Sequence, residues 1–215
     1  MRTPSSFVFR PRDANPLGVE PLVIVGAGGH GRVVLDAALA SGLQVAGFVA
    51  DPVQGPVNGI AFLGPTAMLD ELHDTHRFIV AIGDQQARRE LSLRLAGRLQ
   101  SVIHPTAWVS RTARIGQGTA VIGGVIVNAN ADVGDFCILN TACSVDHDCR
   151  LADGVQLCPG ARLAGNVSCR EDAFIGTGAV VIPGVHIGVR ATVGAGAVIV
   201  RDISDDSKVS GDASN

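Results

Sequence analysis

The sequence of 215 residues is poor in charged side chains, and this scarcity excludes several classes of protein. Charged residues make up only 17% and the formal net charge is −3, so we expect no basic surface that would bind nucleic acid. No apolar run approaches the roughly 18 residues that cross a membrane. Residues 1–20 lack the apolar segment of a signal peptide, so this leader is not expected to direct secretion.

Cysteine and aromatic residues are also scarce. With no tyrosine, one tryptophan and seven phenylalanines, the core must rely on Val, Ile, Leu and Ala. The five cysteines are odd in number and the context looks cytoplasmic. Together these features favour reduced thiols over a disulfide framework. Glycine, by contrast, is abundant at 27 residues, and hydrophobic residues make up 47%. This combination is typical of short apolar strands joined by many tight turns.

Residues 21–103 alternate between strand and helix signals. The predicted strands are LVIVGAG, QVAGFVADP and FIVAIGD, and the predicted helices are HGRVVLDAALASG, TAMLDELHD and QQARRELSLRLAGR. Strands and helices in alternation predict a small parallel sheet covered by helices, which here amounts to half of a Rossmann-like domain.

Residues 104–203 follow a different rule, a repeat of six. Sixteen hexads run without an insertion from WVSRTA, which begins at Trp108, to VIVRDI. The second residue is Val, Ile or Leu in fifteen hexads and Cys169 in the other, and the sixth is always Ala, Val, Thr, Cys or Ile. Three hexads close a triangular coil of eighteen residues with the second-position side chains stacked inside. The repeat therefore predicts a parallel β-helix of about five coils, followed by a C-terminal tail at residues 204–215.

Two positions of the hexad carry further information. Glycine and asparagine at the fifth position suit corners that need unusual backbone angles, at Gly118, Gly124, Asn130, Gly160, Asn166, Gly178, Gly184 and Gly196. Cysteine fills the sixth position at Cys137, Cys143 and Cys149. Because steps of six fall on different sides of the coil, we interpret these thiols as core fillers rather than as a metal site, and we expect no metal.

The segment GAGGHG, Gly26–Gly31, matches G-x-G-x-x-G between a predicted strand and a predicted helix. Glycines there let backbone N–H groups approach a phosphate, which the helix N-terminus also favours. His30 could reach a phosphate or sugar, and Asp51, twenty residues past Gly31, could hold a ribose hydroxyl. A dinucleotide-binding dehydrogenase is one interpretation. About eighty residues before the repeats are only half of a dinucleotide fold, so a mononucleotide fits better, and a tight turn without a ligand is the structural alternative.

The segment SVDHDC, Ser144–Cys149, places Asp146, His147 and Asp148 side by side within the repeats. His147 is fourth in its hexad, at a corner after the buried second position, so its side chain is expected to leave the core. A carboxylate beside an imidazole raises its basicity and fixes its tautomer. The triplet is therefore a candidate acid–base group, with surface decoration as the alternative.

Six segments carry a more specific resemblance: VIVGAGGHGRVVLDA, FVADP, VAIGDQQARRE, IHPTAWVS, NTACSVDHDC and GARLAGNV. In this order, over residues 22–200, they resemble the bacterial hexapeptide-repeat acetyltransferases that modify amino sugars carried on a nucleotide. That family includes enzymes acetylating UDP-linked 4-amino sugars for bacillosamine and GDP-perosamine for O-antigen, with sialic-acid O-acetyltransferases as relatives. The resemblance implies a left-handed β-helix and a homotrimer, with the nucleotide on the N-terminal domain and acetyl-CoA along the β-helix between two subunits.

The resemblance also implies site residues by their position in the motifs. His147 would be the catalytic base and Asp148 its acidic partner. The implied substrate-binding residues are Gly28, Gly29, His30, Gly31, Asp51, Pro52, Gly83, Asp84 and Asn140, the last of them near the reacting amine. The implied contacts to acetyl-CoA are Gln156, Gly165, Thr177 and Ala195. Gly165 would offer its N–H to the thioester oxygen, and Gln156 stands where some relatives have a histidine.

The implied function is acetyl-CoA-dependent N-acetylation of a nucleotide-linked 4-amino-4,6-dideoxy sugar. The segment NTACSVDHDC favours GDP-perosamine, although no motif that reads the base chooses GDP over UDP. A sugar O-acetyltransferase of the sialic-acid type and a non-catalytic β-helix scaffold are the alternatives. The tail sequence VSGDASN departs from the V-x-G-x-P-A-[KR] ending of many relatives, which puts contacts from the C-terminus to coenzyme A in doubt.

Overall fold

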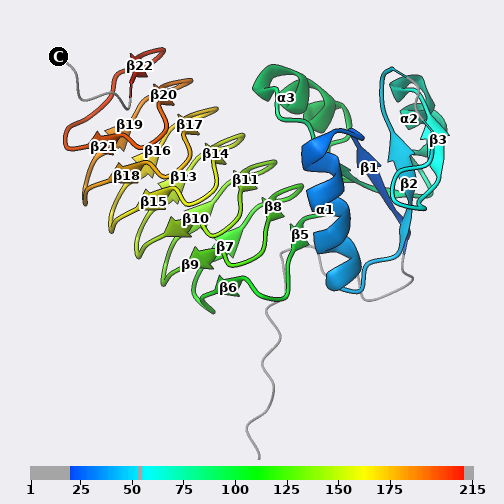
Figure 1. Ribbon diagram of the computed structural model, residues 1–215, viewed down its shortest axis with the longest axis horizontal. Coiled ribbons are helices and arrows are strands. Elements are labelled where there is room, and N and C mark those ends of the chain that lie inside the picture. The colour runs from blue at the N-terminus through cyan, green and yellow to red at the C-terminus, as the bar shows by residue number, and fades with distance from the viewer. Residues whose placement is uncertain (1–19, 53–54, 211–215) are drawn as a thin grey trace, which may run out of the picture.

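A computed structural model of the protein describes residues 20–52 and 55–210. The expected leader, apart from Glu20, and the last five residues of the expected tail lie outside the described residues. The chain forms a small α/β part and a stack of triangular coils beside it, as Figure 1 shows from blue to red along the chain. Within the described residues, no helix is both long enough and apolar enough to cross a membrane.

The α/β part contains a four-stranded parallel sheet of order β3-β2-β1-β4. Its strands are β1 (Leu22–Val25), β2 (Val45–Val49), β3 (Phe62–Gly64) and β4 (Arg77–Val80). Its helices are α1 (Gly29–Ala40), the short η1 (Thr66–Met68) and α2 (Leu69–Leu72), and α3 (Gln85–Arg94). The chain leaves β1 toward β2 on one side and later returns to β4 on the other. Such a reversal opens a crevice at the carboxyl end of the central strand.

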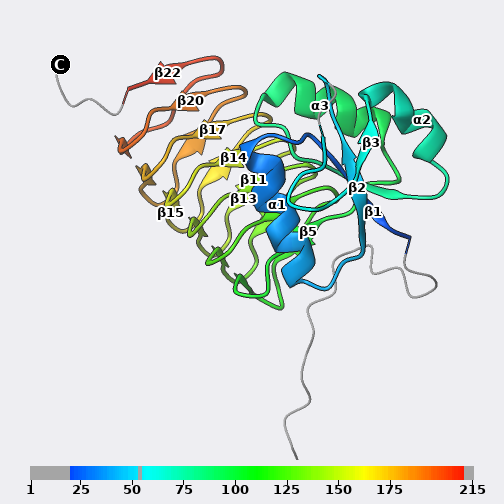
Figure 2. The ribbon, with the colours of Figure 1, turned by 45° about the vertical axis from the view of Figure 1, so that its right-hand side comes forward.

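The central strands of the sheet are buried on both faces because they are mainly apolar. Leu22 and Ile24 of β1 pack with α1, whereas Val23 and Val25 pack with Leu69 of α2 and with residues after α3. The cluster around α1 continues into the β-helix through Val102, Ala120 and Ile122. Helix α1 therefore lies between the sheet and the stack of coils, which Figure 2 shows from the turned view.

The stack of coils is a three-sided parallel β-helix. The first side contains β5 (Val102–Ile103), β8 (Ala120–Val121), β11 (Ile138–Leu139), β14 (Gln156–Leu157), β17 (Phe174–Ile175), β20 (Thr192–Val193) and β22 (Lys208–Val209). The second side contains β6 (Trp108–Val109), β9 (Ile126–Val127), β12 (Ser144–Val145), β15 (Arg162–Leu163), β18 (Val180–Val181) and β21 (Val198–Ile199). The third side contains β7 (Arg114–Ile115), β10 (Asp132–Val133), β13 (Arg150–Leu151), β16 (Ser168–Cys169) and β19 (His186–Ile187).

The hexad pattern accounts for this architecture. Val127 pairs with Val145 and Val145 with Leu163, so neighbouring strands are eighteen residues apart as the repeat predicts. The second- and sixth-position side chains form one continuous buried core along the β-helix. The fifth-position glycines and asparagines named above all have positive φ, which these residues adopt at the least steric cost.

The coils create three kinds of corner, and these names are used below. The first corner joins the first and second sides, the second corner joins the second and third sides, and the third corner joins the third and first sides. The first side packs against the α/β part through Val102, Ala120 and Ile122. In a triangle the second corner is the vertex opposite the first side, so it points away from the α/β part.

Candidate functional site

The histidine of the SVDHDC segment lies on the second corner, between β12 and β13. Its ring nitrogen Nδ1 is 2.8 Å from Asp148 Oδ2, and the His147 side chain is 53% exposed. Asp148 holds the corner at a φ of 59°, a left-handed conformation that Asp tolerates better than most residues. The same turn that brings the chain around the coil therefore presents the carboxylate to the imidazole.

The pair is electrostatically coupled. The hydrogen bond to Asp148 raises the pKa of His147 above 6.5, with smaller Coulombic contributions from Asp146 and Asp148 that also raise it. The hydrogen bond from His147 lowers the pKa of Asp148, so this carboxylate stays ionised. With Nδ1–H donated to Asp148, the lone pair of Nε2 is available to accept a proton.

Both flanking carboxylates are held from the coil below. Asn128 Nδ2 donates to Asp146 Oδ1 over 2.9 Å, and Asn130 Nδ2 donates to Asp148 Oδ1 over 3.2 Å. Asp146 Oδ1 also accepts from the backbone N–H of His147 at 2.8 Å. Sequence reasoning missed the two asparagines, although the eighteen-residue coil places each directly beneath the aspartate that it supports.

Gly165 lies one coil above His147 on the same corner. A Cβ built on Gly165 would be 2.5 Å from both Cε1 and Nε2 of the imidazole, so a larger residue there would push the ring out of this position. Within the described part of the chain, the Gly165 N–H has no hydrogen-bond acceptor. The corner thus combines a proton acceptor with an unused backbone donor, the two groups that acyl transfer to a nucleophile needs.

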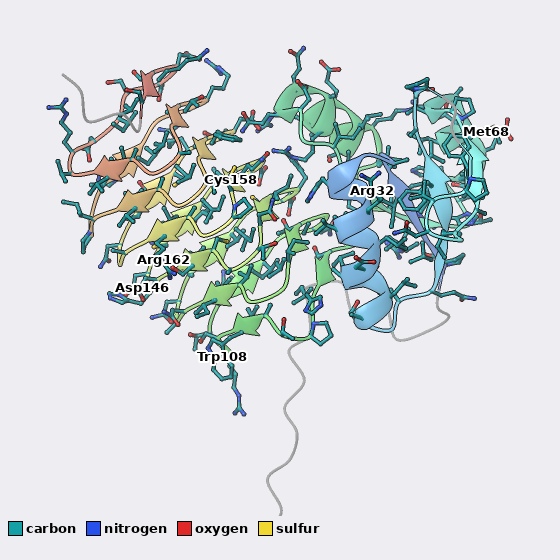
Figure 3. All side chains as sticks on the ribbon, in the orientation of Figure 1. Arg32, Met68, Trp108, Asp146, Cys158 and Arg162 are labelled. Atoms are coloured by element: carbon teal, nitrogen blue, oxygen red, sulfur yellow. The ribbon has the colours of Figure 1, made fainter. Side chains whose placement is uncertain are left out.

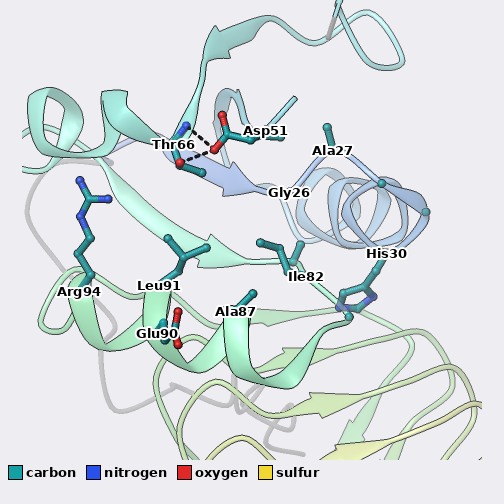
Figure 4. Close-up of a pocket in the computed structure, with 15 residues that line it drawn as sticks. Gly26, Ala27, His30, Asp51, Thr66, Ile82, Ala87, Glu90, Leu91 and Arg94 are labelled. Atoms are coloured by element: carbon teal, nitrogen blue, oxygen red, sulfur yellow. Dashed lines mark hydrogen bonds between the residues drawn. The ribbon is translucent and has the colours of Figure 1, made fainter. Parts of the chain in front are cut away.

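A separate cavity of about 860 Å³ lies at the carboxyl ends of β1, β2 and β4 (Figure 4). Gly28, Gly29 and His30 at the start of α1 form part of its wall, with Asp51 and Gly83 opposite. These five predicted residues therefore come together. The size is within the range of cavities that hold small ligands, and the α1 N-terminus suits an anion.

Several lining residues were not foreseen from the sequence. Thr66 donates its backbone N–H and its hydroxyl to Asp51 Oδ2, which fixes the carboxylate at the cavity edge. Glu90 and Arg94 project from α3 toward the same cavity, and Arg94 pairs with Asp70 at 2.7 Å. No sequence motif marks these positions, because the cavity wall is assembled from segments that only the fold brings together.

His30 has an unusual environment within this cavity wall. Burial, aided by the charge of Arg88, lowers the pKa of His30 to about 4, so its imidazole is neutral near pH 7. Its Nε2 is buried without a hydrogen-bond partner among the described residues. His30 therefore lines the cavity as a neutral ring and contributes no positive charge.

Three predicted substrate contacts have other positions. Gly31 is buried behind the turn, where a Cβ would be 2.0 Å from Gly26 O, so it permits close helix–strand packing. Asp84 caps α3 by accepting from Ala87 N at 2.8 Å. Neither residue lines the cavity, and Pro52 does not line it either.

The remaining predicted residues are divided between different parts of the β-helix. Asn140, Thr177 and Ala195 follow strands of the first side and lie on first corners, across the second side from His147. Gln156 faces the α/β part, where its Oε1 accepts from Arg88 and its side chain is buried. The expected contact of Gln156 with acetyl-CoA is therefore not supported, because this amide is already engaged at the junction between the two parts.

Comparisons with known proteins agree with this geometry. Residues 21–95 match the family described as the PglD N-terminal domain. GDP-perosamine N-acetyltransferase from Escherichia coli O157:H7 is 33% identical over 172 residues, covering 75% of this chain and 78% of that protein. PerB from Caulobacter crescentus, solved in complex with CoA and GDP-perosamine, is 44% identical with a TM-score of 0.83, covering 89% and 94% of the two chains. The acetyltransferase domain of PglB from Neisseria gonorrhoeae FA1090, solved with acetyl-CoA, is 42% identical with a TM-score of 0.87, covering 90% and 97%.

The chain belongs to the hexapeptide-repeat sugar N-acetyltransferase family. Membership confirms the fold class expected from the sequence, a half-Rossmann domain followed by a left-handed parallel β-helix. It also explains why a cavity suited to a nucleotide and an exposed histidine corner occur in one chain. As an acetyltransferase of this family, the protein uses acetyl-CoA as its cosubstrate.

Proposed function

We propose that this chain transfers the acetyl group of acetyl-CoA to the 4-amino group of a nucleotide-linked 4-amino-4,6-dideoxy sugar. The observation that carries the proposal is the exposed His147–Asp148 pair lying directly against Gly165 of the next coil. GDP-perosamine is the first candidate substrate, because it appears in the names of the E. coli relative and of the Caulobacter complex.

In the proposed mechanism, His147 is the general base. The amine attacks the thioester carbonyl carbon, a C–N bond forms, and the amine proton passes to His147 Nε2. The Gly165 N–H stabilises the oxyanion, the C–S bond breaks, and the imidazolium returns the proton to the departing thiolate. General-base catalysis of this kind contributes typically about 10²–10⁴-fold, and one oxyanion donor about 10²–10³-fold. A thioester is already activated, so the reaction requires no metal.

In this proposal each of the two parts of the chain binds one substrate. Residues 21–103 hold the nucleotide, and support comes from the cavity at the start of α1 with its backbone N–H groups and its neutral His30. Residues 104–203 hold acetyl-CoA beside Gly165, with Thr177 and Ala195 as further contacts and Asn140 near the amine. The cytoplasm is the proposed location, and the five free cysteines support it.

The proposed active unit is a homotrimer, because one chain keeps its two substrate regions apart. The nucleotide cavity lies in the part that packs against the first side, whereas His147 lies on the opposite vertex of the triangle. Asp146, the neighbour of His147, lies on the side of the β-helix away from the α/β part in Figure 3. If copies pack through their second sides, a first corner of one copy meets a second corner of the next. Asn140, Thr177 and Ala195 would then complete the site around another copy's His147.

Replacement of His147 tests the proposal. His147→Asn should lower kcat about 10²–10⁴-fold with GDP-perosamine, because the general base is lost, while binding of GDP is retained. The assay is thiol release from acetyl-CoA, with product mass confirming N-acetylation. A matched control is His73→Asn, since His73 is also exposed and bonds its neighbour Asp74 at 3.0 Å, but lies outside the repeats. Near-normal turnover in folded His147→Asn would remove it as the base.

A substrate panel tests which nucleotide sugar is used and whether one of the alternative functions applies. Calorimetry and turnover with GDP- and UDP-linked amino sugars, free sialic acid and acetyl-CoA alone separate the alternatives. Turnover of a sugar hydroxyl without any nucleotide requirement would indicate an O-acetyltransferase. Absence of any heat with acetyl-CoA would indicate a scaffold.

A further inference from the structure

One buried arginine connects the nucleotide cavity to the β-helix. Arg88, on the first turn of α3, is only 1% exposed. Its Nη1 donates to the carbonyl oxygens of Ile82 at 2.9 Å and Gly83 at 3.3 Å. Both residues belong to the loop that lines the nucleotide cavity.

The same guanidinium reaches the coils on its other edge. Nη2 donates to Gly154 O on a third corner at 3.0 Å, and Nη1 also donates to Gln156 Oε1 on β14 at 3.2 Å. The planar fork of an arginine spreads five N–H donors over three nitrogens, whereas the three donors of a lysine radiate from one nitrogen, so arginine can span acceptors that lie farther apart. Arg88 therefore ties the cavity loop and the first side of the β-helix to one rigid group.

The neighbouring contacts of α3 are different in kind. Gln85 Nε2 donates to Asp172 O at 2.8 Å, and Arg89 Nε pairs with Asp172 Oδ2 at 2.6 Å. These bonds attach the helix to the coils but do not reach the cavity loop. Among the α3 side chains described, Arg88 alone forms hydrogen bonds both to the cavity loop and to the coils.

We propose that Arg88 is a positioning residue, which holds the nucleotide cavity at the distance from the β-helix that acetyl transfer requires. The inference rests on the proposed function. In the trimer proposed above, the β-helices pack against each other, so the place of a cavity relative to its own β-helix fixes its distance to the partner copy's base. A shift of the loop would leave nucleotide contacts intact while moving the amine away from the thioester.

The expected signature is a loss of kcat without a loss of nucleotide affinity. A misplacement of about 1 Å can cost about 10²-fold in rate. Arg88→Met should therefore lower kcat at least about 10-fold, while the Kd for GDP changes less than about 3-fold. Arg88→Lys should be intermediate. The control is Arg190→Met, which removes an exposed arginine paired with Asp206 on the last coil and should leave both quantities unchanged.

The variants are compared after circular dichroism confirms folding, with wild-type transfer to GDP-perosamine measured first. A normal kcat in folded Arg88→Met overturns the inference, and so does a fall in GDP affinity that matches the fall in kcat. If Arg88→Met does not fold, Gln156→Leu decides, because it removes only the link to β14. Lower kcat with retained GDP affinity then supports the inference, and an unchanged kcat overturns it. A wild-type chain without transfer activity overturns the proposed function and, with it, this inference.

Discussion

At the scale of single residues, the His147 site is a chain of supported contacts rather than an isolated imidazole. Asn130 holds Asp148, and Asp148 holds His147, each over no more than 3.2 Å. A half-exposed imidazole would otherwise sample several rotamers, which costs rate in a reaction that depends on orientation. The supports therefore fix the direction of Nε2 toward Gly165.

The pH dependence of the reaction follows from the same hydrogen bond. The base must be neutral, so the rate falls as the pH drops through the pKa of His147, which Asp148 raises above 6.5. Asp148→Asn removes the largest cause of that increase. The acidic limb of kcat/KM against pH should therefore move to lower pH, and the plateau should fall because a weaker base remains.

The control for this measurement is Asp146→Asn. Asp146 raises the pKa of His147 only through a Coulombic contribution smaller than the hydrogen bond from Asp148, so its variant should shift the limb less. An acidic limb that keeps its midpoint in Asp148→Asn would contradict the assigned role of Asp148.

These residues differ in how far the sequence predicts them. His147 and Asp148 are adjacent, and the hexad position places them on a corner, so local pattern suffices. Asn128 and Asn130 are predictable only by stepping back one coil of eighteen residues. Arg88 carries no local signal at all, because an arginine on a polar helix is ordinarily exposed. Its burial depends on how α3 docks against the coils, which no short segment encodes.

At the scale of elements, the six-residue pattern predicts the β-helix because one aliphatic position per hexad must face inward. The final coil is the exception. Thr192 pairs with Lys208, sixteen residues away, so this coil is two residues short. A regular hexad after Ile203 would have placed Asp205 in the core. Because the final coil is two residues shorter, Ile203 instead pairs with Ile187 and Val209 pairs with Val193. The cost of burying a carboxylate explains a register change that the repeat alone does not reveal.

The tight stacking of coils makes a stability prediction. A Cβ on Gly176 would be 2.6 Å from Ala195 N and 2.7 Å from Val193 O, both backbone atoms of the next coil. Gly176→Ala should destabilise the protein by about 1–3 kcal/mol, since backbone cannot move aside without loosening the coil. At this chain length that corresponds to roughly 2–4 °C of Tm per kcal/mol.

The matched control is Gly55→Ala, because a Cβ there meets nothing within 4 Å. It should leave Tm unchanged or slightly raised, since alanine restricts the unfolded chain. Thermal unfolding followed by circular dichroism compares the two variants. Equal Tm values would show that the coils can spread locally to accept a methyl group.

At the scale of the whole molecule, the exposed apolar side chains are unevenly distributed. Six of the nine large ones described lie on or directly after strands of the second side: Trp108, Ile126, Val180, Ile182, Val198 and Val200. Figure 3 shows Trp108 projecting from the lower end of the coils. Ser144 and Arg162 separate Ile126 from Val180 on this face, and an exposed face that carries this many apolar side chains marks an association surface. Its position beside the His147 corner is what links assembly to catalysis in the proposed trimer.

A charge placed on this face separates assembly from folding. Val198 is 64% exposed, so Val198→Asp should fold normally but should dissociate the proposed trimer, because association would bury an unpaired carboxylate. Leu93→Asp is the control, since Leu93 is similarly exposed at 58% but lies on α3. Sedimentation velocity should show a smaller species for Val198→Asp only, with GDP binding retained and acetyl transfer lost. A monomeric variant that still transfers acetyl groups at the normal rate would mean that one chain supplies both substrate regions to the same reaction. The separation between the nucleotide cavity and His147 would then have to close by movement within a single chain.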